Sequence, residues 1–69
     1  MDSSAQGERY ARLFRKAGAH LAKGKVARAL EVLKEGRALA ERNGHLRMAR
    51  MFAAEIERAG RVPDRDAGA

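Results

Sequence analysis

The chain has 69 residues, a formal net charge of +6 and no cysteine. This length makes one small domain with a limited core, which no disulfide can stabilise. Charged residues make up 35% of the chain, a composition typical of helical proteins. No stretch approaches the roughly 18 apolar residues of a membrane span, and the first residues, MDSSAQGER, lack the features of a secretion signal. We therefore expect a cytoplasmic protein that does not bind membranes.

The first predicted helix becomes regular at about Glu8 and ends at Gly24, a residue type that commonly stops helices. Gly7 weakens its first turn relative to alanine. Apolar residues recur at helical spacing on one face, and basic residues occupy the opposite face. The apolar positions are Tyr10, Leu13, Phe14, Ala17 and Leu21. An interior glycine lowers helix stability unless a neighbour needs the space, so Gly18 predicts a close helix approach.

The segment 24–40, GKVARALEVLKEGRALA, is the central element because it is apolar on two sides. At 100° per residue, one stripe consists of Val26, Leu30, Leu33 and Ala40, and a second consists of Val32 and Leu39. Small residues, Ala29 and Gly36, separate the two stripes. A helix with such a broad apolar surface is usually packed between two neighbours. The pattern therefore predicts a second helix that runs to about Arg42 and lies in the middle of three.

A third helix is predicted after the Asn43–Gly44 pair, from about His45 to Ala59. Its apolar stripe consists of Met48, Ala49, Phe52, Ile56 and Ala59. The connections on both sides of the middle helix are short, which forces neighbouring helices to run antiparallel. We therefore expect an all-α, three-helix antiparallel bundle over residues 1–60, built as a helical hairpin plus a third, capping helix. Residues 61–69 are expected to form a flexible C-terminal tail.

An internal repeat appears when the chain is shifted so that position 17 falls on position 53. The segment AGAHLAKGKV at 17–26 then aligns with AAEIERAGRV at 53–62, and Ala17, Gly24 and Val26 each meet an identical residue. The match fails at Pro63. The third helix therefore looks like the first helix of a second repeat whose second helix is missing.

A group of large and small residues across the first two helices resembles the tetratricopeptide-repeat (TPR) pattern. The group is Leu13, Ala17, His20, Gly24, Val26, Ala29, Leu33 and Gly36, and the resemblance extends over residues 10–60. It implies pairs of antiparallel helices whose first members line a concave surface that binds a peptide or helix of a partner. By this resemblance, the solvent side of the first helix would face the ligand. The residues on that side are Arg12, Lys16, His20 and Lys23.

Exposed apolar residues on the third helix predict self-association. Met51 lies about 60° outside the apolar stripe of that helix, so it should be partly exposed in a monomer. A homodimer would also compensate for the small core of so short a chain. The predicted self-association patch consists of Val32, Leu39, Met51 and Phe52.

The segment from Arg9 to Leu30 contains several basic residues and no acidic one. Such an imbalance favours an acidic partner surface, nucleic acid or anionic lipid. The third helix offers no outward Asn or Gln of the kind that reads bases. The alternative to a protein partner is therefore a basic helical domain that binds nucleic acid non-specifically, through phosphate contacts.

The sequence does not favour an enzyme. It has no cysteine, its only serines lie at positions 3 and 4, and it lacks a phosphate-binding glycine-rich loop. His20 and His45 lie on different predicted elements, without a third ligand at metal-site spacing. We expect no catalytic, cofactor or metal site. The main prediction is a self-associating protein–protein interaction or assembly module whose partner is a protein or an acidic peptide.

Overall fold

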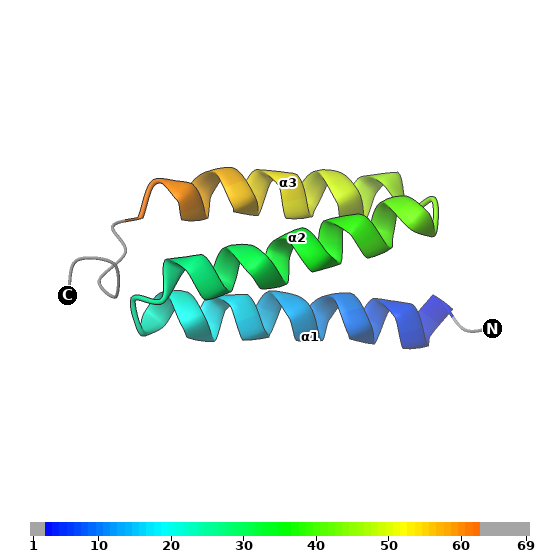
Figure 1. Cartoon of the computed structure of the whole chain (residues 1–69). Helices are drawn as coiled ribbons and strands as arrows, with labels where there is room; N and C mark the ends of the chain where they lie inside the picture. The colour runs from blue at the N-terminus through cyan, green and yellow to red at the C-terminus, as the bar shows by residue number, and fades with distance from the viewer. Residues whose placement is uncertain (1–2, 63–69) are drawn as a thin grey trace.

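The computed structural model describes residues 3–62, with side chains from Gln6 onward. This part of the chain contains three α-helices and no strand: α1 (Ser3–Ala22), α2 (Val26–Arg42) and α3 (Leu46–Gly60) (Figure 1). The predicted all-α, three-helix fold is confirmed. Helix α1 begins at Ser3, earlier than the regular start predicted at Glu8, because Gly7 does not interrupt its first turns. Most of the predicted C-terminal tail, residues 63–69, lies outside the described residues.

Both inter-helix turns end the preceding helix in the same way. Gly24 and Gly44 have φ values of +79° and +74°, which glycine adopts without steric cost. After α1, the amide of Lys25 donates to the carbonyl of His20 at 2.9 Å, and after α2, the amide of His45 donates to the carbonyl of Ala40 at 2.8 Å. A hydrogen bond from an amide to the carbonyl five residues earlier, around a glycine with positive φ, is characteristic of the Schellman motif at helix ends. The two turns reverse the chain within three residues and make successive helices antiparallel.

Helix α2 packs against both α1 and α3 (Figure 1). The largest fully buried side chain of this helix is Leu33, which is 1% exposed, and five further residues of the helix are buried. The buried residues of α2 are Val26, Ala29, Val32, Leu33, Gly36 and Ala40. These are members of the two stripes and of the small residues between them, so the middle position predicted for this helix is confirmed.

A neighbouring helix packs closely against Gly36 but not against Gly18. A Cβ built on Gly36 would overlap the ring of Phe52, whereas a Cβ on Gly18 would meet nothing within 4 Å. The prediction of a close contact at Gly18 was therefore wrong. The reason is geometric: Gly18 lies beside the apolar stripe of α1 and faces open space, while Gly36 lies in the centre of the α2 surface that α3 covers.

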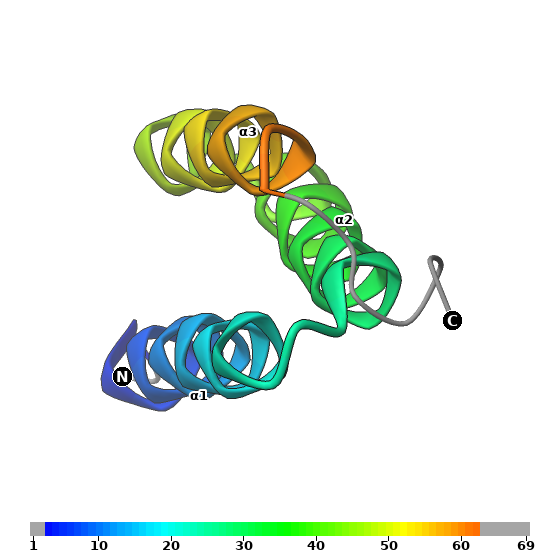
Figure 2. The same cartoon turned by 90° about the vertical axis from the view of Figure 1, so that its left-hand side faces the viewer.

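Helices α1 and α3 spread apart on one side of α2, as the end-on view shows (Figure 2). Their contact is weaker than the contact of either with α2. Aromatic rings link the two helices: Phe14 of α1 stacks on Phe52 of α3, with ring centroids 4.2 Å apart and planes inclined by 4°. Phe14 also lines an open pocket between the two diverging helices.

Candidate functional site

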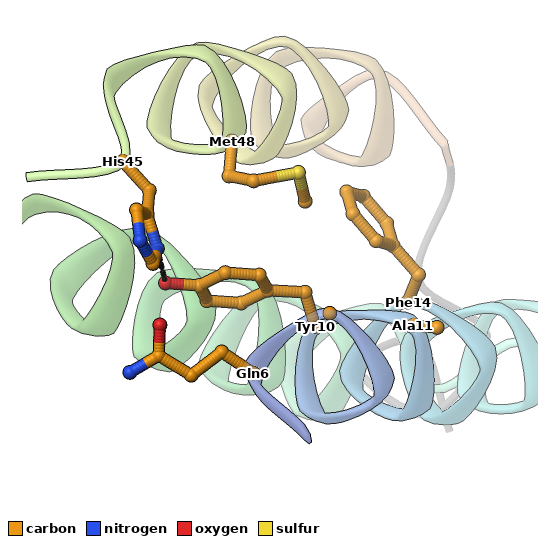
Figure 3. A pocket seen from close by; sticks show the side chains of 7 residues that line it. Gln6, Tyr10, Ala11, Phe14, His45 and Met48 are labelled. Carbon is orange, nitrogen blue, oxygen red and sulfur yellow. Dashed lines mark hydrogen bonds between the residues drawn. The ribbon is translucent and has the colours of Figure 1, made fainter. Parts of the chain in front are cut away.

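An open pocket of about 350 Å³ lies between α1 and α3 (Figure 3). The first half of α1 forms one wall, and the start of α3 forms the other. The lining residues are Gln6, Gly7, Tyr10, Ala11, Phe14, His45 and Met48. We call this hollow the α1–α3 groove. Pockets that bind ligands or apolar side chains are commonly concave and apolar with a few polar groups, and this groove has that character.

A hydrogen-bonded cluster forms the polar end of the groove. The Tyr10 hydroxyl lies 2.7 Å from Nδ1 of His45, and Nδ2 of Asn43 donates to the Tyr10 oxygen at 3.4 Å. Tyr10 is only 3% exposed, so its hydroxyl proton needs a protein acceptor. Donation to Nδ1 supplies that acceptor and favours the His45 tautomer that carries its proton on Nε2. The cluster fixes the ring of Tyr10 and joins α1 to the α2–α3 turn.

Stacked rings support the apolar part of the groove. Phe52 is fully buried, and both Phe14 and Tyr10 contact its ring, Tyr10 in an edge-on arrangement with centroids 5.9 Å apart. Phe14 and Met48 are only partly buried, because one side of each faces the groove. The flexible, polarisable side chain of methionine adapts its shape to different apolar partners. The groove thus combines a rigid aromatic base with one adaptable wall.

Small residues of α1 form part of one wall of the groove. A Cβ built on Gly7 would meet nothing within 4 Å, and the next groove position on this helix is Ala11. Gly18 lies on the same side of α1 further along the helix and also faces open space. Small residues let another backbone approach closely, so this wall leaves room for an extended peptide or a helix.

Each of the two helices that border the groove carries an exposed arginine close in sequence to a groove residue, although neither arginine lines the pocket. Arg15 lies one turn beyond Ala11 on α1, and Arg47 immediately precedes Met48 on α3; both are exposed. The ion pairs within residues 3–62 join Arg37 to Glu41 and Arg58 to Glu55, so Arg15 and Arg47 are both without an acidic partner in the described part of the chain.

The predicted basic face lies on another side of α1. Arg12, Lys16 and Lys23 are exposed and His20 is half-buried. At 100° per residue, these four residues lie roughly 100–180° around the helix from Ala11. The structure therefore keeps them together but places them away from the groove. The ligand-facing side inferred from the family resemblance does not coincide with the hollow, because the residues of α1 that face the hollow are Gly7, Ala11 and Phe14.

The residues of the predicted self-association patch do not form one exposed surface. Phe52 is 0% exposed and Val32 is 7% exposed, because both belong to the core of a single chain. Leu39 is half-buried, on the side of α2 that adjoins α1. Of the four, Met51 alone is well exposed, at 49%. The placement of Phe52 and Val32 on an outer surface was wrong, since Phe52 packs against Gly36 and against the rings of Tyr10 and Phe14.

Two features were missed by sequence reasoning. The Tyr10–His45 hydrogen bond joins residues 35 positions apart, and no local pattern marks such a pair. Leu46, by contrast, is 64% exposed and lies outside the apolar stripe of α3, so helical periodicity could have identified it as an exposed apolar residue.

No helix within residues 3–62 has the length and hydrophobicity needed to cross a membrane. In the same part of the chain, no three His, Asp or Glu side chains gather in a way that could hold a metal ion. No protein-family model matches the chain, and comparisons with curated proteins and with solved structures gave no significant match.

Proposed function

We propose that the chain is a small protein–protein interaction or assembly module of TPR-like type, and that the α1–α3 groove is its binding site. One observation carries the proposal: the groove is an open, mostly apolar hollow of about 350 Å³ between two helices. A partner would insert a large apolar side chain between Tyr10, Phe14 and Met48. Recognition of a helix or peptide in an apolar groove is a recurrent mode of protein binding.

The charge of the chain supports an acidic partner. The net charge is +6. Arg15 and Arg47 are exposed on the two helices that border the groove, and neither has an acidic partner among residues 3–62. A partner with Asp or Glu next to its apolar side chain would be attracted to these arginines, and its association rate would fall as salt is added.

The arrangement of the helices supports the TPR-like part of the proposal. An antiparallel hairpin, α1 and α2, is followed by a third helix that diverges from α1 on one side of α2. This agrees with the repeat in the sequence, in which the third helix corresponds to the first. The residues that the resemblance assigned to the ligand side of α1, among them Arg12 and Lys16, lie on another side of that helix, so the choice of the groove as the binding site rests on its shape and not on the resemblance.

The test is to fill the groove and compare the variant with a matched one. Ala11→Trp places an indole in the groove, whereas Ala19→Trp places the same group on the exposed side of α1. Proteins retained from a lysate by the immobilised wild type and by Ala19→Trp, but not by Ala11→Trp, are groove ligands. The binding segment of such a ligand, as a synthetic peptide, should shift the amide NMR signals of Ala11, His45 and Met48. Equal retention by all three proteins, or shifts outside the groove, would overturn the proposal.

A second candidate function rests on the outer side of α1, where Arg12, Lys16 and Lys23 are exposed. None of them forms an ion pair with a residue of the described segment 3–62. This surface is suited to non-specific phosphate contacts with nucleic acid. If it is used in this way, the affinity for duplex DNA or RNA will fall steeply with salt and will be weakened by Lys16→Glu but not by Ala11→Trp. An affinity independent of salt would exclude phosphate binding.

A further inference from the structure

Helix α3 has a second uncovered surface, on the side turned away from the groove. There, α2 and α3 border a shallow hollow of about 190 Å³, lined by Arg37, Glu41, Leu46, Ala49, Arg50 and Ala53. Leu46 is two residues from Met48, hence about 160° around the helix from the groove wall. At 64% exposure it is the most exposed of the large apolar side chains in the described residues. Exposed apolar side chains beside a hollow are typical of contact surfaces.

The internal repeat explains why this surface is open. Aligning position 17 with position 53 also places Leu46 on Tyr10 and Ala53 on Ala17. Tyr10 and Ala17 are 3% and 2% exposed and belong to the core, which α1 forms mainly with the helix that follows it, α2. Leu46 and Ala53 are the equivalent residues of α3. No helix follows α3 within residues 3–62, so Leu46 is exposed and Ala53 is only half-buried.

The charges on this surface match those of a second copy of the same surface. Arg50 and Glu57 are exposed, lie seven residues apart and therefore point in nearly the same direction from α3. Neither takes part in the ion pairs found within residues 3–62. Between them lie two small residues, Ala53 and Ala54. Arg50 and Glu57 thus lie at equal distances on either side of these small residues. When a second copy of the helix is placed antiparallel to the first, each arginine lies opposite a glutamate of the other copy.

We infer that a second copy of this chain packs antiparallel against this face of α3, about a two-fold axis at Ala53–Ala54. This inference rests on the proposed function as an assembly module, and it assigns the self-association predicted from the sequence to a different surface. Arg50 then lies opposite the partner's Glu57, and the symmetry repeats the pair, as isologous interfaces require. In the same register, Leu46 lies opposite the partner's Arg61 and beside the partner's Gly60, where a Cβ would meet nothing within 4 Å in a single chain.

The distribution of charge favours α3 over α1 as the dimer helix. Contact through α1 would bring two basic faces together, each carrying Arg12, Lys16 and Lys23. In a dimer through α3, the contact lies on the side of α3 turned away from the groove that α1 borders. The basic faces then stay far apart, and repulsion between them is screened by salt.

The experiment reverses charges at the two ends of the proposed contact. Sedimentation velocity at tens of micromolar protein should show the wild type as a dimer. Arg50→Glu and Glu57→Arg each place like charges opposite one another twice, so each variant should raise the dimer dissociation constant about tenfold or more. Mixing the two variants places opposite charges at every position and should give a heterodimer. The doubly substituted Arg50→Glu/Glu57→Arg chain should dimerise like the wild type.

Two controls separate this inference from the groove proposal. Arg12→Glu makes the same charge change on the outer side of α1 and should leave the dimer unchanged. Circular dichroism should show every variant folded, since the substituted residues are exposed. A monomeric wild type, a dimeric Arg50→Glu protein, or a mixture that fails to associate would overturn the α3 dimer. Peptide binding in the groove, measured with Ala11→Trp as above, is a separate result that can succeed or fail independently.

Discussion

The ring of Phe52 fills the space next to the α-carbon of Gly36, where any side chain would have to lie. This contact sets the distance between α2 and α3. Gly36→Ala should therefore lower the free energy of unfolding by about 1–3 kcal/mol, because the methyl group would displace a fully buried ring that also stacks on Phe14. Urea denaturation followed by circular dichroism at 222 nm measures the change.

Gly18→Ala is the matched control for that prediction. It makes the same chemical change inside a helix, but at a position where the new Cβ meets nothing within 4 Å. It should raise the free energy of unfolding by about 0.5–1 kcal/mol, since alanine has the higher helix propensity. If both variants were stabilised, the close packing at Gly36 would be disproved.

Tyr10→Phe tests the hydrogen-bonded cluster at the polar end of the groove. Removing the hydroxyl takes away the partner that lies 2.7 Å from Nδ1 of His45, as well as the longer bond from Asn43. The expected loss is about 1 kcal/mol of unfolding free energy, the typical net contribution of such a bond. Because phenylalanine keeps the ring, the packing on Phe52 stays intact and isolates the contribution of the hydroxyl.

The control for Tyr10→Phe is the double variant that also carries His45→Ala. If the hydroxyl and the imidazole act on each other, the loss in the double variant will be smaller than the two separate losses added together. Strictly additive losses would show that the two groups are not coupled.

Substitutions at Gly44 test the backbone conformation of the α2–α3 turn, because side-chain packing plays no part at this position. Its φ of +74° lies in the left-handed region, and a Cβ built there would meet nothing within 4 Å. Gly44→Ala should therefore cost about 1–2 kcal/mol from backbone strain alone. Gly44→Asn should cost less, because asparagine tolerates these angles better than alanine. Thermal melts of both variants provide the measurement, and equal melting temperatures for the two would contradict a left-handed turn in solution.

The three helices could be predicted from the sequence because local signals specify them. Glycines at 24 and 44 mark both turns, and the two apolar stripes around Leu33 mark the middle helix. Helical periodicity depends only on residues within a few turns of one another. The antiparallel direction of neighbouring helices could also be predicted, because the connections between them are too short for any other arrangement.

The groove could not be predicted in the same way. Helical periodicity shows which side of a helix is apolar, but not which of two glycines, Gly18 or Gly36, lies at a helix crossing. It also does not show that Phe52 is enclosed by Phe14, since that contact joins helices separated by α2 in the sequence. The apolar stripe of α1 therefore indicated a core face, although the side of that helix around Ala11 borders an open hollow.

Leu33→Ala tests the middle position of α2, on which both the groove and the α3 surface depend. Leu33 is 1% exposed, so its truncation leaves a cavity between the three helices. The expected loss is about 2–5 kcal/mol, a large part of the stability of a domain this small. Leu30→Ala, at a half-buried position on the same helix, should cost clearly less. If Leu33→Ala leaves the chain unfolded, Leu33→Met serves instead, because it keeps most of the volume and should cost less than about 1.5 kcal/mol. A Leu33→Ala protein that is as stable as the wild type would show that α2 is not enclosed by its two neighbours.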